Sequence, residues 1–378
     1  QVGYATLFFG ALGYYFPVFK NQWVLAVAVS VLTWLIFAAL TRGVKQAAVM
    51  NLVVTVAKIL PILSFIVLVA FLGFSWDKFT LDFWGESTGS SFSKQLQGIM
   101  LYTVWVFIGI EGASVYSKQA RKRTDVGRAT IIGFLSVLAM LVAVSTLSFG
   151  VLTQEELAAL PDNSMGAVLE AVVGPWGGVF ISIGVCLSVL GAYVSWQMLC
   201  AEPIVLMARG GLLPAVLGRV NRAGAPFAAQ LVSTVVIQFF VIVFFASETS
   251  YNAMVQLATI MYLLPYIFSA LYLVILCLRP EDDPTKGEVR PGTSENRRHL
   301  FVGVVAFIYS LWLIYAADPV FVLFGALAVL PGLVPYVWTK RARGERLFNT
   351  FEWFVVALVV VGAVIALVGL LNGTLVLG

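Results

Sequence analysis

Two ionisable residues stand inside apolar segments of this sequence, where a charged side chain is costly and marks a candidate functional site. Glu111 belongs to the stretch Ile108–Gly112, which reads Ile-Gly-Ile-Glu-Gly. Lys58 stands three residues before Pro61 in a long apolar run. A carboxylate or an ammonium at such a depth can bind an ion of opposite charge, carry a proton, or tie helices together.

Gly109 and Gly112 flank the carboxylate of Glu111. Glycines weaken a helix and free backbone groups, which is tolerated at membrane depth only where protein or a water-filled cavity surrounds them. We therefore predict that the helix breaks here. A broken helix that carries a charge near the bilayer midplane is how many secondary transporters hold their substrate. The pattern favours a transporter.

Several roles are open for the residues of the break. Glu111 contacts a cationic substrate, orients the broken segment, pairs with a basic group, or only satisfies hydrogen bonds. Freed amides at Gly109 and Gly112 would suit a substrate carboxylate. Trp105 lies one turn before Gly109 on the same face, where it either packs or stacks on a guanidinium or ammonium.

Lys58 is too far from either end of its span to reach the interface easily. Burial would disfavour its charged form unless a carboxylate or several carbonyls stabilise the ammonium. It is a fixed cation between helices, a proton-coupling group, or a substrate contact. Pro61 loosens the preceding turn and frees a carbonyl near it.

The remaining candidates are weaker. Glu202 suits an interfacial or gating position, and His299 an interfacial one. Three cysteines lie within spans and are expected to be reduced packing residues. The sequence has no P-loop, GxSxG, HExxH or His/Cys cluster, so no metal, cofactor or enzymatic activity is predicted.

The composition requires a membrane to surround these residues. The apolar fraction is 60%, the charged fraction is 11% and the mean hydropathy is +0.96. We predict an all-α polytopic membrane protein forming a single transmembrane domain over residues 1–378. Its eleven expected spans are 2–19, 23–41, 47–74, 97–117, 129–150, 175–207, 226–246, 251–278, 299–316, 319–338 and 352–376.

Basic residues divide cleanly between alternate loops. Nineteen of the 23 lysines and arginines fall on one side, Lys20, Lys78 and Lys94 fall on the other, and Lys58 lies within a span. The positive-inside rule places the nineteen in the cytoplasm. The net charge of +4 therefore needs no nucleic acid to explain it. On the other side, Thr153 and Glu156 fit a capping box for a short helix.

Three motifs identify a family. Residues 105–114 followed by 122–130 resemble the sixth helix and next loop of amino acid–polyamine–organocation permeases. Residues 211–226 resemble the loop after that family's eighth helix, and residues 309–312 resemble its eleventh helix. Within the superfamily, the sequence is most similar to basic amino acid antiporters of the arginine/ornithine type.

This resemblance implies a LeuT-like fold of two inverted five-helix repeats with broken first and sixth helices. Span 97–117 is then the sixth helix and the span at residue 2 is the third. The first repeat would end within 1–74, the second would occupy 97–278, and additional helices would fill 299–376. The first two helices of the family fold are expected to be missing, and with them half of the site.

The resemblance also implies residue roles. Trp105 and Ile108 would lie beside the substrate side chain, while Glu111 would position the break or contact the ligand. Trp196 matches an aromatic of the eighth helix. Lys58 matches a lysine that replaces sodium in some relatives. At Gly10-Ala11, no counterpart is expected for the aromatic of the arginine/agmatine exchanger.

The predicted function is arginine/ornithine exchange by alternating access in a bacterial inner membrane. The alternatives are a proton-coupled permease for lysine or a neutral amino acid, and a sensor that binds amino acid without transporting it. The expected partners are arginine, ornithine and lysine as substrates, together with the lipid bilayer. Formation of a homo-oligomer stays open.

Overall fold

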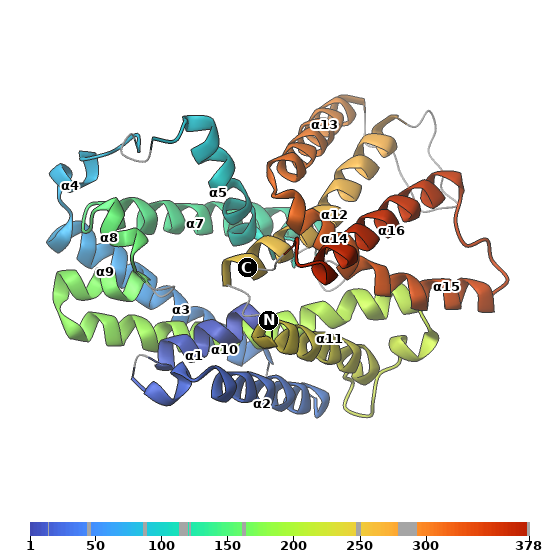
Figure 1. The fold of residues 1–378 in the computed structure, drawn as a ribbon, viewed down its shortest axis with the longest axis horizontal. Helices are drawn as coiled ribbons and strands as arrows, with labels where there is room; N and C mark the ends of the chain where they lie inside the picture. The colour runs from blue at the N-terminus through green and yellow to red at the C-terminus, as the bar shows by residue number, and fades with distance from the viewer. Residues whose placement is uncertain are drawn as a thin grey trace.

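The fold is taken from a computed structural model. It describes residues 1–13, 15–43, 47–85, 89–112, 120, 122–160, 164–246, 251–278 and 293–375. Every extended regular element within these ranges is a helix, so the all-α class is confirmed (Figure 1). The helices run mainly along the long axis of the molecule.

In the described part of the chain, nine helical segments are long and apolar enough to cross a membrane. They are α2 (Gln22–Thr41), α3 (Ala47–Leu68), α7 (Arg123–Phe149), α10 (Pro175–Arg209), α11 (Phe227–Ala246), α12 (Tyr251–Leu278), α13 (Thr293–Ala316), α14 (Pro319–Val329) with α15 (Leu333–Ala342), and α16 (Thr350–Leu371). A π-helical turn, Val69–Gly73, extends α3.

The other two expected spans contain shorter helices, α1 (Val2–Gly13) and α5 (Phe92–Phe107). The prediction of a continuous span over 2–19 is wrong, because α1 ends at Gly13 and a separate 3-10 turn, Pro17–Lys20, follows. The segment 97–117 is interrupted after Phe107, as the glycines around Glu111 predict. Helical structure is thus present in all eleven predicted spans.

Three short helices lie in predicted loops: α4 (Trp76–Thr80), α8 (Gln154–Ala158) and α9 (Ser164–Val173). The predicted capping box of α8 is confirmed. The Thr153 hydroxyl accepts from the Glu156 amide at 3.3 Å, and the Glu156 carboxylate accepts from the Thr153 amide at 2.9 Å.

The two predicted repeats contain pairs of equivalent helices, and the members of two such pairs pack against each other. If α5 is the sixth family helix, then α1 and α10 are the third and eighth, and α2 and α11 the fourth and ninth. The structure packs α1 on α10 and α2 on α11, around one buried cluster that includes Ala5, Val29, Tyr193 and Val241. A symmetry axis between two repeats would produce these pairs. The repeat boundaries themselves stay a prediction.

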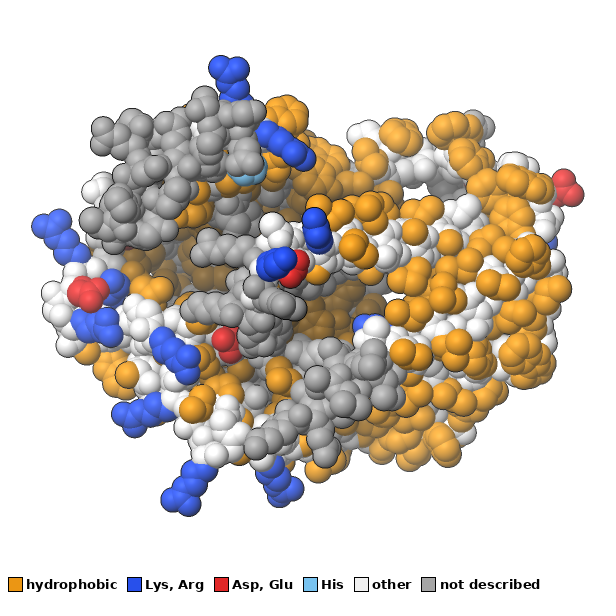
Figure 2. Space-filling view, turned by 180° about the vertical axis from the view of Figure 1, so that it is seen from behind, with side chains coloured by type: hydrophobic (Ala, Val, Ile, Leu, Met, Phe, Trp, Pro, Cys, Tyr) orange, Lys and Arg blue, Asp and Glu red, His pale blue; other side chains and the backbone are white. Residues whose placement is uncertain are grey.

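The connections between helices gather at two opposite ends. At one end, the Asn221 amide donates to the Thr41 carbonyl at 2.7 Å, and the Arg343 guanidinium packs against Gly211. At the other end, the Gln22 amide donates to the Phe245 carbonyl at 3.0 Å, and Lys78 donates to Val151 at 2.6 Å. Figure 2 shows Lys and Arg side chains gathered toward one end and hydrophobic side chains over much of the remaining face. This is the distribution expected of a chain that crosses the membrane repeatedly.

Candidate functional site

The break in α5 has a defined backbone. Ile108, which follows the last helical residue, has an extended backbone, and Gly109 adopts a φ of +108°. The turn is closed by a hydrogen bond of 2.9 Å from the Gly112 amide to the Gly109 carbonyl. Such a positive φ strongly favours glycine. The predicted break is therefore confirmed, and it depends on Gly109 directly.

Gly109 also lets an indole approach the backbone of the break. A Cβ atom built on Gly109 would lie 2.8 Å from Cζ2 of Trp196, a distance that real Cβ contacts do not reach. Trp196 lies on α10, so the contact joins two candidate residues from distant parts of the chain. By contrast, a Cβ on Gly112 would meet no heavy atom within 4 Å among the described residues. The backbone is packed at Gly109 and open at Gly112.

The carboxylate of Glu111 ties the break to itself and to α12. Its Oε2 atom accepts a hydrogen bond of 2.9 Å from the Gly109 amide and one of 3.0 Å from the Tyr266 hydroxyl. Both bonds are partly buried. Within the described part of the chain, Oε1 has no hydrogen-bond donor. The two bonds tie the carboxylate to the broken segment and to α12, and the role of Glu111 in substrate binding stays a prediction.

Aromatic side chains from α1, α10 and α12 line the region next to the carboxylate. The rings of Trp196 and Tyr262 meet edge to face, with centroids 6.0 Å apart and an interplanar angle of 83°. Tyr262 is followed on the same face of α12 by Tyr266, with centroids 6.2 Å apart. Tyr4 of α1 lies near the Trp196 indole. Rings in this arrangement present faces and hydroxyl groups that suit a cation.

Sequence reasoning missed these three tyrosines. The signal for Tyr262 and Tyr266 was present, because two polar-tipped aromatics four residues apart flank Pro265 within an apolar span. Tyr4 of α1 lies near Trp196, whereas the lack of an aromatic counterpart at Gly10-Ala11 stays a prediction.

Two further predicted residues lie beside the break. Trp105 and Ile108 are both partly buried at the end of α5, one on each side of Phe107. No ring contact of Trp105 occurs among the described residues. Its predicted stacking on a substrate side chain is therefore untested by the structure and stays a prediction.

Lys58 does not join the cluster. Its side chain is exposed on α3, and within the described ranges it makes no hydrogen bond or ion pair. The structure does not decide among a fixed cation between helices, a proton-coupling group and a substrate contact, so the role of Lys58 stays a prediction. Pro61, one turn further along, is the buried residue, and it packs so closely on Gly184 of α10 that a Cβ there would clash. Trp196 lies twelve residues beyond Gly184, about 18 Å along α10, so Lys58 and the aromatic cluster occupy different levels.

Comparison with known proteins agrees with this architecture. The sequence pattern described as amino acid permease matches residues 2–339, most of the chain. The chain belongs to the amino acid permease family. This permease is 62% identical to the L-lysine transport protein of Corynebacterium glutamicum, over 99% of the chain and 77% of that protein.

Two other relatives carry antiporter names. The permease is 43% identical to the arginine/ornithine antiporter of Pseudomonas aeruginosa, over 100% of the chain and 79% of that protein. It is 34% identical to the arginine/agmatine antiporter of Chlamydia pneumoniae, over 93% of the chain and 72% of that protein. Family membership identifies a polytopic amino acid transporter. In such a transporter, the broken helix, the Glu111 carboxylate and the aromatic side chains beside it form a candidate substrate site.

Proposed function

We propose that this permease is a secondary transporter of basic amino acids that exchanges L-arginine for L-ornithine by alternating access. The observation that carries the proposal is the position of Glu111. Its carboxylate lies in a helix break, with one oxygen held by Gly109 and Tyr266 and the other without a donor among the described residues. The names of the relatives from Pseudomonas aeruginosa and Latilactobacillus sakei support the substrate pair.

The site offers separate partners for the two ends of a basic amino acid. The guanidinium or ammonium of the side chain would lie against the aromatic faces of Trp105 and Trp196, within reach of Glu111. The α-carboxylate would bind the backbone amides that the break at Gly109 and Gly112 leaves free. No covalent step is involved, and the proposal assigns no catalytic residue.

Alternating access would act on the contact between α5 and α12. The bond between Glu111 and Tyr266 joins the broken segment to α12, and it spans the two elements whose separation would open the site. A substrate cation that engages Glu111 would compete with or reinforce this bond. Binding energy would thereby be linked to the movement of one helix group against the other.

The membrane is proposed to be the bacterial inner membrane, with the strongly basic end in the cytoplasm. This orientation follows from the positive-inside rule. It places the turns at Arg343, Gly211 and Asn221 inside the cell. The turns at Gln22 and Lys78 would face outward.

A second candidate function is lysine transport without obligatory exchange. The 62% identity to a protein named L-lysine transport protein favours lysine as a substrate. In this case Lys58 is the residue to examine for proton coupling, because its amine lies well inside a span.

Uptake into proteoliposomes that contain the full-length transporter tests the proposal. Labelled L-arginine or L-lysine would be offered to vesicles that are empty or preloaded with L-ornithine, without an ion gradient. Uptake that requires internal ornithine establishes exchange. Uptake into empty vesicles that appears only with an inward proton gradient would contradict exchange and support the lysine permease. Lack of uptake of either amino acid under all conditions would contradict both functions.

A further inference from the structure

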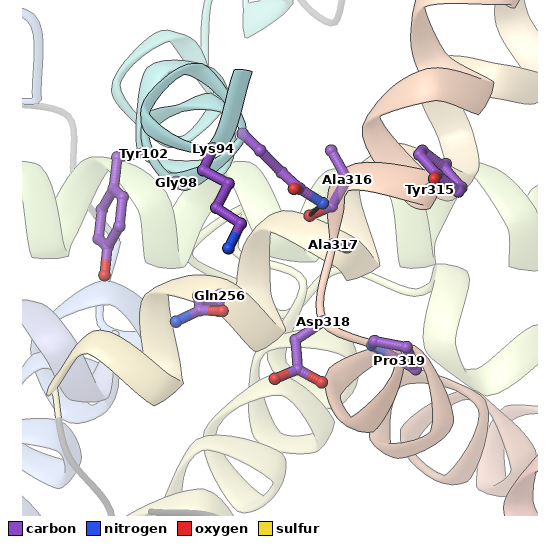
Figure 3. Close-up of a pocket in the computed structure, with 10 residues that line it drawn as sticks. Lys94, Gly98, Tyr102, Gln256, Tyr315, Ala316, Ala317, Asp318 and Pro319 are labelled. Atoms are coloured by element: carbon purple, nitrogen blue, oxygen red, sulfur yellow. Dashed lines mark hydrogen bonds between the residues drawn. The ribbon is translucent and has the colours of Figure 1, made fainter. Parts of the chain in front are cut away.

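An open cavity of about 700 Å³ lies away from the break, at the beginning of the same helix, and most of the side chains that line it are exposed (Figure 3). Its walls come from the start of α5, from α12, and from the turn that joins α13 to α14. The polar side chains that line it are Lys94, Gln97, Tyr102, Gln256, Tyr315 and Asp318. Its volume is in the range typical of small-molecule sites, roughly 300–1,000 Å³. None of these residues takes part in the site around Glu111.

The cavity has one positive and one negative side chain that do not pair with each other. Lys94 of α5 makes no ion pair within the described ranges, and its ammonium points into the cavity toward Gln256 (Figure 3). Asp318 uses Oδ1 to cap α14, accepting from the Val320 amide at 2.9 Å. Its other carboxylate oxygen has no hydrogen-bond donor among the described residues. The two charges thus form separate parts of one cavity wall.

Neutral groups complete the polar lining. Gln256 of α12 lies below the Lys94 ammonium in Figure 3, and its amide can both donate and accept. The Tyr102 hydroxyl is a further donor or acceptor. The Gln97 amide already donates one hydrogen bond, to the Ala316 carbonyl at 3.4 Å. The cavity therefore offers one cation, one anion and adaptable hydrogen-bonding groups.

We propose that this cavity is a second amino acid site, which binds the α-ammonium and α-carboxylate of a free amino acid. The carboxylate is held by the Lys94 ammonium and the Gln256 amide, and the ammonium by the free oxygen of Asp318. The amino acid side chain extends toward the mouth of the cavity beside Tyr315, which is 80% exposed. The ligand class follows from Lys94 and Asp318, and it does not depend on the substrate proposed for the central site.

The position of the cavity connects it to transport. Tyr102 lies six residues before Ile108 on α5, about 9 Å along the helix. Gln256 lies on α12, the helix that carries Tyr262 and Tyr266. A ligand held between Lys94 and Gln256 therefore touches both helices that the Glu111–Tyr266 bond joins at the central site.

Equilibrium binding of labelled L-lysine to the full-length transporter in nanodiscs tests the proposal. We expect two molecules bound per wild-type transporter. Trp196→Leu should remove the central component and leave the second. Lys94→Gln or Asp318→Asn should weaken the second component about tenfold or more, since each removes one charge-assisted contact. Asparagine also caps helices well, so Asp318→Asn leaves the start of α14 intact.

Lys20→Gln is the matched control, because Lys20 is an exposed lysine outside the cavity. It should bind two molecules like the wild type. A single site that Trp196→Leu abolishes would overturn this proposal and leave the proposed function standing. A second component that Lys94→Gln and Asp318→Asn both leave unchanged would also overturn it. Absence of any lysine binding by the wild type would overturn the second site and count against a lysine-binding central site.

Discussion

Glu111 and Lys58 are both ionisable residues within predicted spans, yet they lie in contrasting surroundings. Glu111 accepts two hydrogen bonds and stands beside an aromatic cluster. Lys58 is exposed on a continuous helix and has no ion pair within the described ranges. The difference follows from the local backbone. A break supplies free amide donors to a carboxylate, whereas the amides and carbonyls of an intact helix are already used.

Removing the Glu111 carboxylate tests this comparison most severely. Glu111→Ala deletes the acceptor for Gly109 and Tyr266, and each bond to a charged group is worth about 1.5–3 kcal/mol. We expect arginine exchange in proteoliposomes to fall at least about 100-fold. Retention of wild-type exchange by correctly folded Glu111→Ala protein would show that the carboxylate has no role at the site.

The two glycines of the break form a matched pair. Gly109→Ala forces a side chain into a left-handed conformation and against Trp196, which should cost about 2–3 kcal/mol. Gly112→Ala places its Cβ in open space and should cost much less. Thermal unfolding in detergent and arginine binding would measure both variants. Equal effects from the two substitutions would contradict the packing described here.

The Tyr266 hydroxyl can be removed without its ring. Tyr266→Phe loses the bond to Glu111 and should weaken exchange about 5- to 30-fold, corresponding to about 1–2 kcal/mol. Tyr262→Phe is the control, because it keeps the edge-to-face contact with Trp196 and removes no hydrogen bond to Glu111. Initial rates of ornithine-driven arginine uptake distinguish the two. A larger loss for Tyr262→Phe would reverse the assignment of these tyrosines.

Replacing Lys58 should affect transport less than the substitutions at the helix break. Lys58 has no hydrogen-bond or ion-pair partner among the described residues, so Lys58→Met breaks no such contact and removes a charge that is costly within a span. The exchange rate should change about twofold or less. The rate would be measured between pH 5.5 and 8 with and without a proton gradient. Loss of gradient-driven uptake in this variant would instead identify Lys58 as a coupling residue.

The smallest effect concerns a carboxylate outside the membrane. Hydrogen bonds from the Thr153 amide and hydroxyl hold the pKa of Glu156 below its usual value. Since the pKa is lowered in the folded state, the contribution to stability is present above the unfolded-state pKa and is lost as the pH falls through the folded-state pKa. The protection factors of the α8 amides, which are corrected for the intrinsic pH dependence of exchange, should therefore fall at acidic pH. Glu156→Gln should remove this pH dependence and leave transport unchanged.

Particular residues show how far sequence reasoning reached. The break at Ile108–Gly112 was predictable, because glycines beside a carboxylate are a local signal. The contact between Gly109 and Trp196 was not, because it joins α5 to α10. Tyr4 was overlooked, since a helical segment alone does not reveal which of its faces meets the site. The predictions for residues 113–119 and 279–292 lie outside the described residues.

Hydropathy, charge and glycine placement determined that this chain forms many membrane helices, that its loops alternate between two ends, and that one helix breaks at a carboxylate. These properties depend on residues near one another in sequence and on the cost of burying polar groups in hydrocarbon. Only the tertiary structure decided that Glu111 pairs with Tyr266, that Lys58 lies apart, and that Lys94 shares a cavity with Asp318. Each depends on how distant helices pack, which the periodicity of a single segment does not specify.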